Sequence, residues 1–322
     1  KSIFFTLRPL LFFLSLFQIY FLLKDKKFDI FISQCGGFGD FRSDFSSIIV
    51  AKILKYPIRS AVLHHCYTKP KIWSSIINVI NYFIAKLCSS IIFVSKATYN
   101  DIKNNTLILK NKKIKYEIIF NGVNTEKIKK KRTLFRKKKN IINALVLSRI
   151  EHGKGHSDLV ESFKYLSKKT RQQYKVYFIG KGDPSFIKIL HKKISNLNFR
   201  NNFYFTGFIN KDSREIISNF DLLLSPTRDF EGFGLSIAES LSIGVPVIAT
   251  KVGGVLDYLN KNNSILVAPK NPKLLASCLK LFCNNRVKYM KKALVGKELI
   301  KKNFSADEMS KNYVKHFNML KK

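Results

Sequence analysis

The stretch SPTRDFEGFGLSIAESLSIGVPVIATKVGG, residues 225–254, carries the strongest structural signal in the chain. Two carboxylates, Glu231 and Glu239, lie around the glycine pair Gly232 and Gly234, where a helix is expected to begin. An apolar run with the composition of a buried parallel strand follows at once. Glycines at a helix N-terminus suit a phosphate, and carboxylates accept hydrogen bonds from hydroxyl groups. The stretch therefore predicts a turn that holds a ligand with both groups, such as a sugar nucleotide.

The spacing of the two glutamates bears on how they could act together. In one continuous helix they would lie on different faces, about 12 Å apart. The glycines between them indicate instead that Glu231 precedes the helix and that Glu239 lies one or two turns inside it, so that both can face one ligand. The alternative is an ordinary first-turn acid and a helix-surface glutamate.

Outside this stretch, short apolar runs alternate with helical patterns along the chain. This alternation predicts an α/β fold with parallel sheets and helices on both faces, in which ligands bind beyond the carboxyl ends of the strands. The expected strands are residues 28–33, 61–64, 91–95, 117–120, 144–148, 175–180, 203–206, 222–225, 245–249 and 265–268.

A charge run, KIKKKRTLFRKKKN at residues 127–140, has the composition of a solvated linker between two doubly wound domains. Two such domains are expected to face a cleft. We predict an N-terminal domain over 1–135, a C-terminal domain over 136–304 and a last helix over 305–322, with Ser305 as its N-cap.

The composition restricts the possible partners. With 46% hydrophobic residues among 322, the chain is not disordered, and a formal net charge of +37 favours anionic partners. Because the lysines are spread out and no nucleic-acid module is present, we favour a membrane surface or simply solvated charge over nucleic acid. None of the five cysteines forms a C-x-x-C pair, which is typical of a protein of a reducing cytoplasm with neither a zinc site nor disulfides.

The apolar stretch 3–23 is interrupted by Arg8, Pro9 and Gln18. Its uninterrupted runs are shorter than the roughly 20 residues needed to span a bilayer. Two interpretations remain, a core helix of an α/β domain and an interfacial helix that seats the protein on a membrane.

Two other loops have residues suited to a phosphorylated ligand. Arg149 and Lys154 follow an expected strand, and two cations at such a strand end suit a diphosphate, although they could also be ordinary surface cations. Gly180 and Gly182 end another expected strand and would let the backbone approach a ligand closely.

Taken together, these motifs resemble the retaining glycosyltransferase family 4 of the GT-B fold, within the glycosyl transferases group 1. The resemblance rests on the E-x7-E spacing of Glu231 and Glu239, the Arg149…Lys154-Gly155 loop, GVPVIAT at 244–250, FVSKATYNDI at 93–102 and FNGVN at 120–124. It covers nearly the whole chain from about residue 28 onward.

The resemblance implies a role for each of these residues. Arg149 and Lys154 would neutralise the donor diphosphate in place of a metal ion. Glu231 would contact the transferred sugar and Glu239 the ribose. The residues Gly232, Phe233, Gly234 and Leu235, at the helix start, would support the phosphates or the sugar, with Gly180 and Gly182 also on the donor side. His64, preferred over His65, would lie near the reacting centre unless it is a structural histidine.

The implied activity is a retaining hexosyltransferase. It would move sugar from a nucleotide-diphosphate donor to a glycan or lipid-linked acceptor, in the synthesis of a surface polysaccharide, lipopolysaccharide or glycolipid. A cytoplasmic place on the inner face of the membrane, and independence of metal, are expected with it. The alternatives are a sugar-nucleotide epimerase of the same fold and an inactive sugar-nucleotide-binding subunit. A basic protein bound to nucleic acid ranks last. The family opens with a strand and glycine-rich loop that we do not find before Ile3, so we expect a truncated start.

Overall fold

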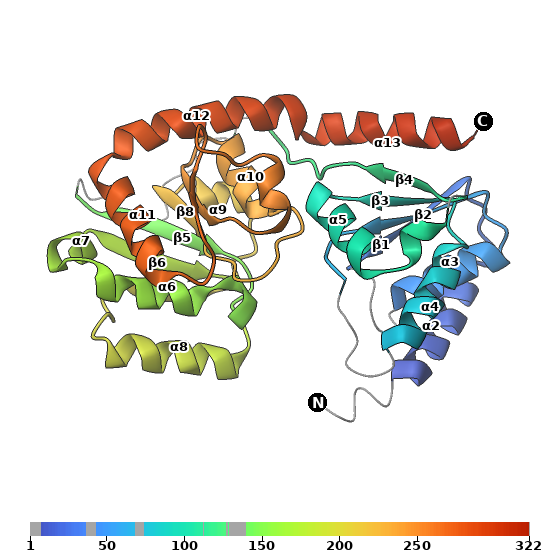
Figure 1. Ribbon diagram of the computed structural model, residues 1–322, viewed down its shortest axis with the longest axis horizontal. Coiled ribbons are helices and arrows are strands. Elements are labelled where there is room, and N and C mark those ends of the chain that lie inside the picture. Colours follow the sequence, from blue (N-terminus) through green and yellow to red (C-terminus); the bar gives the residue numbers. More distant parts are fainter. Residues whose placement is uncertain are drawn as a thin grey trace. The chain divides into compact units, whose positions relative to one another are not determined.

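The computed structural model describes residues 8–36, 43–67, 74–111, 113–126, 128 and 140–321 (Figure 1). The chain divides into two compact units. Unit 1 comprises Lys1–Asn121 with Met309–Lys322, and unit 2 comprises Gly122–Glu308. Each unit contains one parallel sheet. The predicted α/β architecture with two parallel sheets is therefore confirmed.

The sheet of unit 1 has four strands in the order β1-β2-β3-β4, all parallel. Its two central strands are almost entirely buried, as expected where helices or loops cover both faces of a parallel sheet. The strands are β1 (Ile30–Cys35), β2 (Ile58–Leu63), β3 (Ser90–Phe93) and β4 (Lys115–Ile118).

Helices of unit 1 pack on this sheet through a core that includes Ile48, Ile84 and Ile102. Ser95, in the FVSKATYNDI motif, caps α5 by accepting a hydrogen bond from the Thr98 backbone N–H. The elements are α2 (Arg8–Leu23), α3 (Ser43–Ile53), α4 (Ser74–Ala85), α5 (Lys96–Asn105), the 3-10 turn η1 (Ile108–Lys110) and, from Met309 onward, α13 (Ala306–Leu320).

The last helix is held to the sheet of unit 1 by a buried histidine. His316 Nε2 lies 2.9 Å from Ser90 Oγ at the start of β3. At the other end of α13, Ser305 Oγ accepts a hydrogen bond from the Glu308 backbone N–H at 3.2 Å. The predicted N-cap is thus confirmed.

The sheet of unit 2 has six parallel strands in the order β10-β9-β8-β5-β6-β7. The first half of the unit therefore builds outward from β5 on one side and the second half on the other, which is the doubly wound arrangement. The strands are β5 (Ile142–Leu147), β6 (Tyr174–Ile179), β7 (Phe203–Gly207), β8 (Leu222–Ser225), β9 (Val247–Thr250) and β10 (Ile265–Val267).

Helices cover both faces of this sheet. Contacts join α6 to α8 and α11 on one face, and α10 to α9 and α12 on the other, as Figure 1 shows. The helices are α6 (His156–Ser162), α7 (Lys168–Gln172), α8 (Pro184–Asn196), α9 (Ser213–Ile217), α10 (Leu235–Ser242), α11 (Pro272–Asn284) and α12 (Arg286–Asn303). The 3-10 turns are η2 (His152–Lys154), η3 (Phe163–Tyr165) and η4 (Gly253–Asp257).

Unit 2 begins earlier than the charge run in which we placed the domain boundary. The Val123 backbone N–H donates a hydrogen bond to Phe304 O at 2.9 Å. The Val123 carbonyl oxygen accepts a hydrogen bond from the Ala306 backbone N–H at 3.0 Å. Arg214, which is buried, donates to the carbonyls of Asn124 and Glu126. These bonds attach residues 123–126 to unit 2. Most of the charge run lies outside the described residues.

Candidate functional site

The candidate site lies at the carboxyl edge of the unit 2 sheet, where the strand order reverses. Strand β5 pairs with β6 on one side and with β8 on the other. The loops that follow β5 and β8 diverge at this point, and such switch points are where doubly wound sheets bind ligands. The donor-side loops predicted from the sequence are these two and those after β6 and β9.

Two glycines after β9 hold the backbone of Glu231 in place. The Gly254 backbone N–H donates to Glu231 O at 2.7 Å. A side chain on Gly253, which has φ +59°, would bring a Cβ to 2.1 Å from the same oxygen. Glycine is therefore required at residue 253, and Glu231 lies in the loop before α10, as we predicted.

The side chain of Glu231 reaches across the switch point to Lys154. Lys154 Nζ lies 2.7 Å from Glu231 Oε2, and the two side chains are only 18% and 19% exposed. Thr227 Oγ1 is 3.4 Å from the same carboxylate oxygen. Two residues that the sequence separates by 77 positions are thus brought together as a charge-assisted pair.

The backbones of the two loops are in direct contact beneath this pair. Gly155 has φ +74°, and a Cβ there would lie 1.8 Å from Pro226 O. The Arg228 backbone N–H donates to Gly153 O at 2.8 Å. The glycines of the 153–155 loop therefore permit the approach that lets Lys154 meet Glu231.

A second ion pair, which we did not predict, joins the same segments. Arg228 Nη1 lies 2.7 Å from Asp158 Oδ1 in the first turn of α6, and both side chains are largely buried. Burial raises the pKa of the Asp158 carboxyl, while the positive charge of Arg228 acts in the opposite direction. This pair fixes the β8 loop to α6 and so positions Glu231.

Arg149 lies in the same loop as Lys154 but in a different environment. Its side chain is 72% exposed and pairs with Glu151 at 3.1 Å. A long, exposed guanidinium can be reoriented towards a ligand at little cost, because exposed ion pairs contribute little stability. A role for Arg149 on the diphosphate stays a prediction.

Gly180 and Gly182 are explained by packing inside the unit. A Cβ on Gly180, where φ is +151°, would lie 2.0 Å from Ser148 O, and one on Gly182 would lie 2.7 Å from Ile150 Cβ. The loop after β6 therefore packs directly on the loop after β5. This contact alone requires both glycines, and donor binding by their backbone stays a prediction.

The start of α10 is held in place by hydrogen bonds from a buried tyrosine. Tyr258 Oη donates to Phe233 O at 2.9 Å or to Gly234 O at 3.0 Å, and the rings of Phe233 and Tyr258 are in contact. Gly234 caps the helix with φ +82°, a conformation that favours glycine. Gly232 is buried beside them, whereas the Leu235 side chain is exposed. The helix N-terminus, with its positive dipole end, is thus held rigidly next to Glu231.

Glu239 lies in the second turn of α10, in a different setting from Glu231. Burial raises the pKa of the Glu239 carboxyl, and a hydrogen bond with Ser213 at the start of α9 acts in the opposite direction. The charges of Asp212 and Arg214 also act on this carboxyl. Its surroundings are therefore those of α9, and Ser213 is a neighbour that the sequence did not single out.

His64 follows β2 directly, at the carboxyl edge of the unit 1 sheet. Its Nε2 lies 2.6 Å from Gln34 Oε1 of β1, and burial lowers the pKa of the imidazole. A neutral imidazole at a strand end is compatible both with a reacting-centre residue and with a structural one. Residues 37–42, which contain much of the CGGFG motif, lie outside the described residues.

The acidic, histidine and cysteine side chains give no sign of a metal centre in the part of the chain that the structure describes. There, no group of three or more of them is placed to hold a metal ion. All five cysteines are free thiols.

Comparison with known proteins places these motifs in a family. Residues 125–295, more than half of the chain, match the family described as Glycosyl transferases group 1. The uncharacterized glycosyltransferase MJ1607 of Methanocaldococcus jannaschii is 26% identical over 216 residues, which are 63% of this chain and 53% of that protein. The O-antigen biosynthesis glycosyltransferase WclY of Escherichia coli is 24% identical over 211 residues, 64% of this chain and 56% of that protein. The chain thus spans about half the length of these curated relatives.

Solved structures share the fold over almost the whole chain. Anabaena HepE in complex with UDP and glucose superimposes with a TM-score of 0.76 at 17% identity, covering 94% of this chain and 81% of that one. A glycosyltransferase from Rickettsia africae gives a TM-score of 0.75 at 21% identity, covering 98% and 82%. Such neighbours establish the GT-B architecture. With this fold and the matched region that contains the Lys154–Glu231 site, the chain belongs to the glycosyl transferases group 1 family.

Proposed function

We propose that the chain transfers a hexose from a nucleoside-diphosphate sugar to a glycan or lipid-linked acceptor, with retention of anomeric configuration. The observation that carries this proposal is the Lys154–Glu231 pair at the switch point of the unit 2 sheet. It joins a cation suited to a diphosphate and a carboxylate suited to sugar hydroxyls at the rigid N-terminus of α10. A hydrolase acting on neutral glycans has no need of the cation and the helix end.

In this proposal the donor is held along the carboxyl edge of the sheet. Its diphosphate lies against Lys154 and the start of α10, and Arg149 turns from Glu151 towards the same charge. When the diphosphate departs, these groups stabilise the negative charge that develops, and no metal ion is required. When the donor binds, Lys154 exchanges its Glu231 partner for the phosphate, which frees Glu231 to accept hydrogen bonds from the sugar.

The two glutamates take different tasks. Glu231 binds hydroxyls of the transferred sugar, and Glu239, near Ser213, binds the ribose. The bond between the anomeric carbon and the diphosphate breaks on the face that the acceptor hydroxyl enters, through an oxocarbenium-like state. The acceptor's proton passes to the departing diphosphate, so a protein nucleophile is not needed. His64 would lie on the acceptor side.

Two of the similar proteins support the choice of substrates. HepE is described with UDP and glucose, which favours a uridine nucleotide sugar as the first donor to test. WclY is described as an O-antigen biosynthesis enzyme, which favours a surface polysaccharide or a lipid-linked precursor as the acceptor class. We place the activity in the cytoplasm at the inner face of the membrane. No described helix is long and apolar enough to cross a bilayer.

A panel of nucleotide sugars, read by thermal shift, tests the donor class. A preferred donor should raise the unfolding midpoint, because a ligand that binds only the folded state stabilises it. Glu239→Ala should abolish that shift, and chelator should leave turnover unchanged. Absence of any shift across the panel would contradict the proposal. Release of a rearranged or hydrolysed sugar without an acceptor would favour the epimerase alternative.

A further inference from the structure

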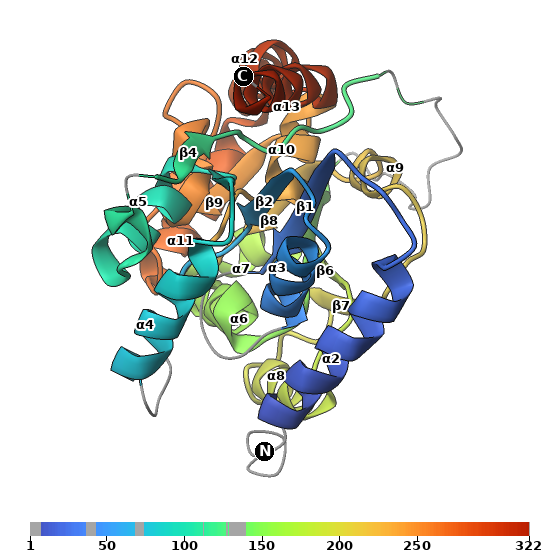
Figure 2. The same cartoon turned by 90° about the vertical axis from the view of Figure 1, so that its right-hand side faces the viewer.

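Unit 1 carries an apolar surface on the outer side of its helices. In Figure 2, α3 lies between α2 and α4, in agreement with the contacts of α3 with both. We call the outer side of these three helices the helical face. Large apolar side chains exposed on these helices define this face: Phe17, Phe21 and Leu22 of α2, Ile53 of α3, and Val79 and Phe83 of α4.

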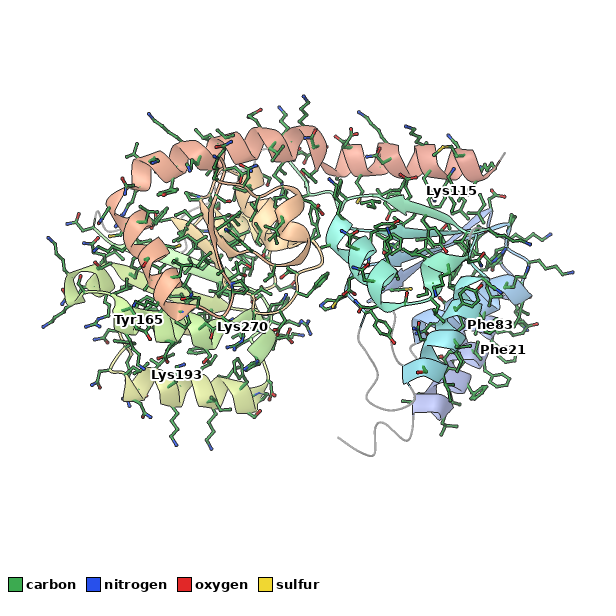
Figure 3. The ribbon with its side chains drawn as sticks, viewed as in Figure 1. Phe21, Phe83, Lys115, Tyr165, Lys193 and Lys270 are labelled. Atoms are coloured by element: carbon green, nitrogen blue, oxygen red, sulfur yellow. The ribbon has the colours of Figure 1, made fainter. Side chains whose placement is uncertain are left out.

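Phe21 of α2 and Phe83 of α4 are exposed aromatic residues on the two outer helices of this face. Their side chains are 62% and 58% exposed, although they come from different helices. Figure 3 shows both rings on the side of the helices that points away from the sheet of unit 1. A single exposed aromatic side chain is normal on a protein surface, whereas a large patch of exposed apolar side chains marks an interaction surface.

Lysines are held against the same rings. Lys24 Nζ lies 5.3 Å from the centroid of Phe21, and Lys86 Nζ lies 5.1 Å from that of Phe83 and 4.5 Å from that of Tyr82. Lys52 is exposed beside Ile53 at the end of α3. Neither α2 nor α4 contains an acidic residue. Phe21 and Phe83 are therefore each accompanied by a cation.

We propose that the helical face seats the protein on an anionic lipid bilayer. Phenylalanine and aliphatic side chains enter the boundary between head groups and acyl chains, while the lysine stems extend along them and bring the ammonium groups to lipid phosphates. The net charge of +37 adds long-range attraction to such a surface. The face lies on the membrane and does not cross it, in line with the lengths of the described helices.

This inference rests on the proposed function for its meaning, because a lipid-linked acceptor has to be met at the membrane. It also bears on the two interpretations of the N-terminal apolar stretch, a core helix and an interfacial helix. One side of α2 packs on α3, where Ser15 Oγ lies 2.6 Å from Ser46 Oγ, and the other carries exposed aromatics. The helix thus combines a core-facing side with an interfacial side.

Co-sedimentation of the full chain with lipid vesicles tests the proposal. Vesicles of phosphatidylcholine alone are compared with vesicles that also contain phosphatidylglycerol. We expect binding to the anionic vesicles, and a loss of about tenfold or more in the double variant Phe21→Ser/Phe83→Ser. Lys24→Gln/Lys86→Gln should weaken binding as well and make it less sensitive to salt.

Helix α12 of unit 2 supplies matched controls, because it also exposes apolar residues and lysines. Val287→Ser/Val295→Ser and Lys288→Gln/Lys291→Gln remove the same number of groups of each kind. They should change vesicle affinity less than about twofold. An equal loss in the α12 lysine variant, with no extra loss in the phenylalanine variant, would show that overall charge alone drives binding and would overturn the proposal. Full binding by the phenylalanine variant, as would be found if the face served a protein partner, would overturn the proposal.

Two further measurements keep the outcomes separate. The unfolding midpoint of each variant shows that it is folded, since all the substituted side chains are on the surface. The thermal shift by nucleotide sugar should be the same in Phe21→Ser/Phe83→Ser and in the parent. If the chain binds vesicles but no nucleotide sugar, the membrane-binding proposal stands and the proposed activity is refuted. If it binds nucleotide sugar but no vesicles, only the membrane-binding proposal is refuted.

Discussion

Two regions of the molecule differ in whether their side chains already have partners: the loops at the carboxyl edge of the unit 2 sheet, and the helical face of unit 1. In the loops, Lys154 already has Glu231 and Arg228 already has Asp158, and glycines let the backbones touch. On the helical face, Phe21 and Phe83 remain exposed to solvent. The loops are therefore organised before a ligand arrives, whereas the face has surface left to bury. A small polar ligand suits the first arrangement, and an extended apolar and anionic partner suits the second.

The largest effect is expected where the loops touch. Gly155→Ala should lower the free energy of unfolding by about 3 kcal/mol, because a Cβ at φ +74° would overlap the carbonyl of Pro226. Urea unfolding measures the change. In Gly153→Ala the new Cβ has no atom within 4 Å, so we expect a change within about 0.5 kcal/mol. Similar losses in the two variants would mean that the loops do not meet at Gly155.

The buried histidine beside Gly155 should make the loops sensitive to acid. Burial lowers the pKa of His156 to about 4. Between about pH 6.5 and 4 the unfolded chain binds a proton that the folded chain excludes, so stability should fall as the pH falls, by about 2 to 3 kcal/mol in all. Unfolding measured across this range tests it. His156→Gln should flatten the decline, whereas His152→Gln, which removes an exposed imidazole of the same loop, should not.

A smaller effect is expected at the pair beneath the site. Asp158→Asn should cost about 1 to 2 kcal/mol of stability, because it leaves the largely buried Arg228 without its charge partner. Asp229 directly follows Arg228 and forms an exposed ion pair with Lys270. Asp229→Asn breaks that pair and should lower the free energy of unfolding by less than about 0.5 kcal/mol. If both substitutions cost the same, the buried pair does not fix the β8 loop.

Features that depend on neighbouring residues in the chain could be predicted from the sequence, whereas features that depend on residues far apart in the chain could not. Most of the described strands could be located from a short apolar run, because burial on both faces of a parallel sheet leaves a local signal. The edge strand β4 is only half-buried and begins two residues earlier than the apolar run we expected there. Ser305 could be identified as an N-cap because capping also depends on neighbouring residues only. The order of the strands has no local signal.

Within the site, local and long-range features divide in the same way. The helix start after Glu231 could be predicted from its glycines. Asp158–Arg228 could not, because each residue is unremarkable in its own segment, and the packing role of Gly180 depends on Ser148, from another strand. The exposed side of α2 could not be told from its buried side, because apolar residues lie on every side of the helix.

The central claim is that Lys154 and Glu231 form a donor site, and titration calorimetry with the best nucleotide sugar of the panel tests it most directly. Lys154→Gln should weaken binding by about tenfold or more, since it removes the cation expected to meet the diphosphate. Lys270→Gln, which removes an exposed lysine from the same edge of unit 2, should leave the dissociation constant unchanged. Equal affinity of the parent and Lys154→Gln would contradict the assignment of this pair as the donor site.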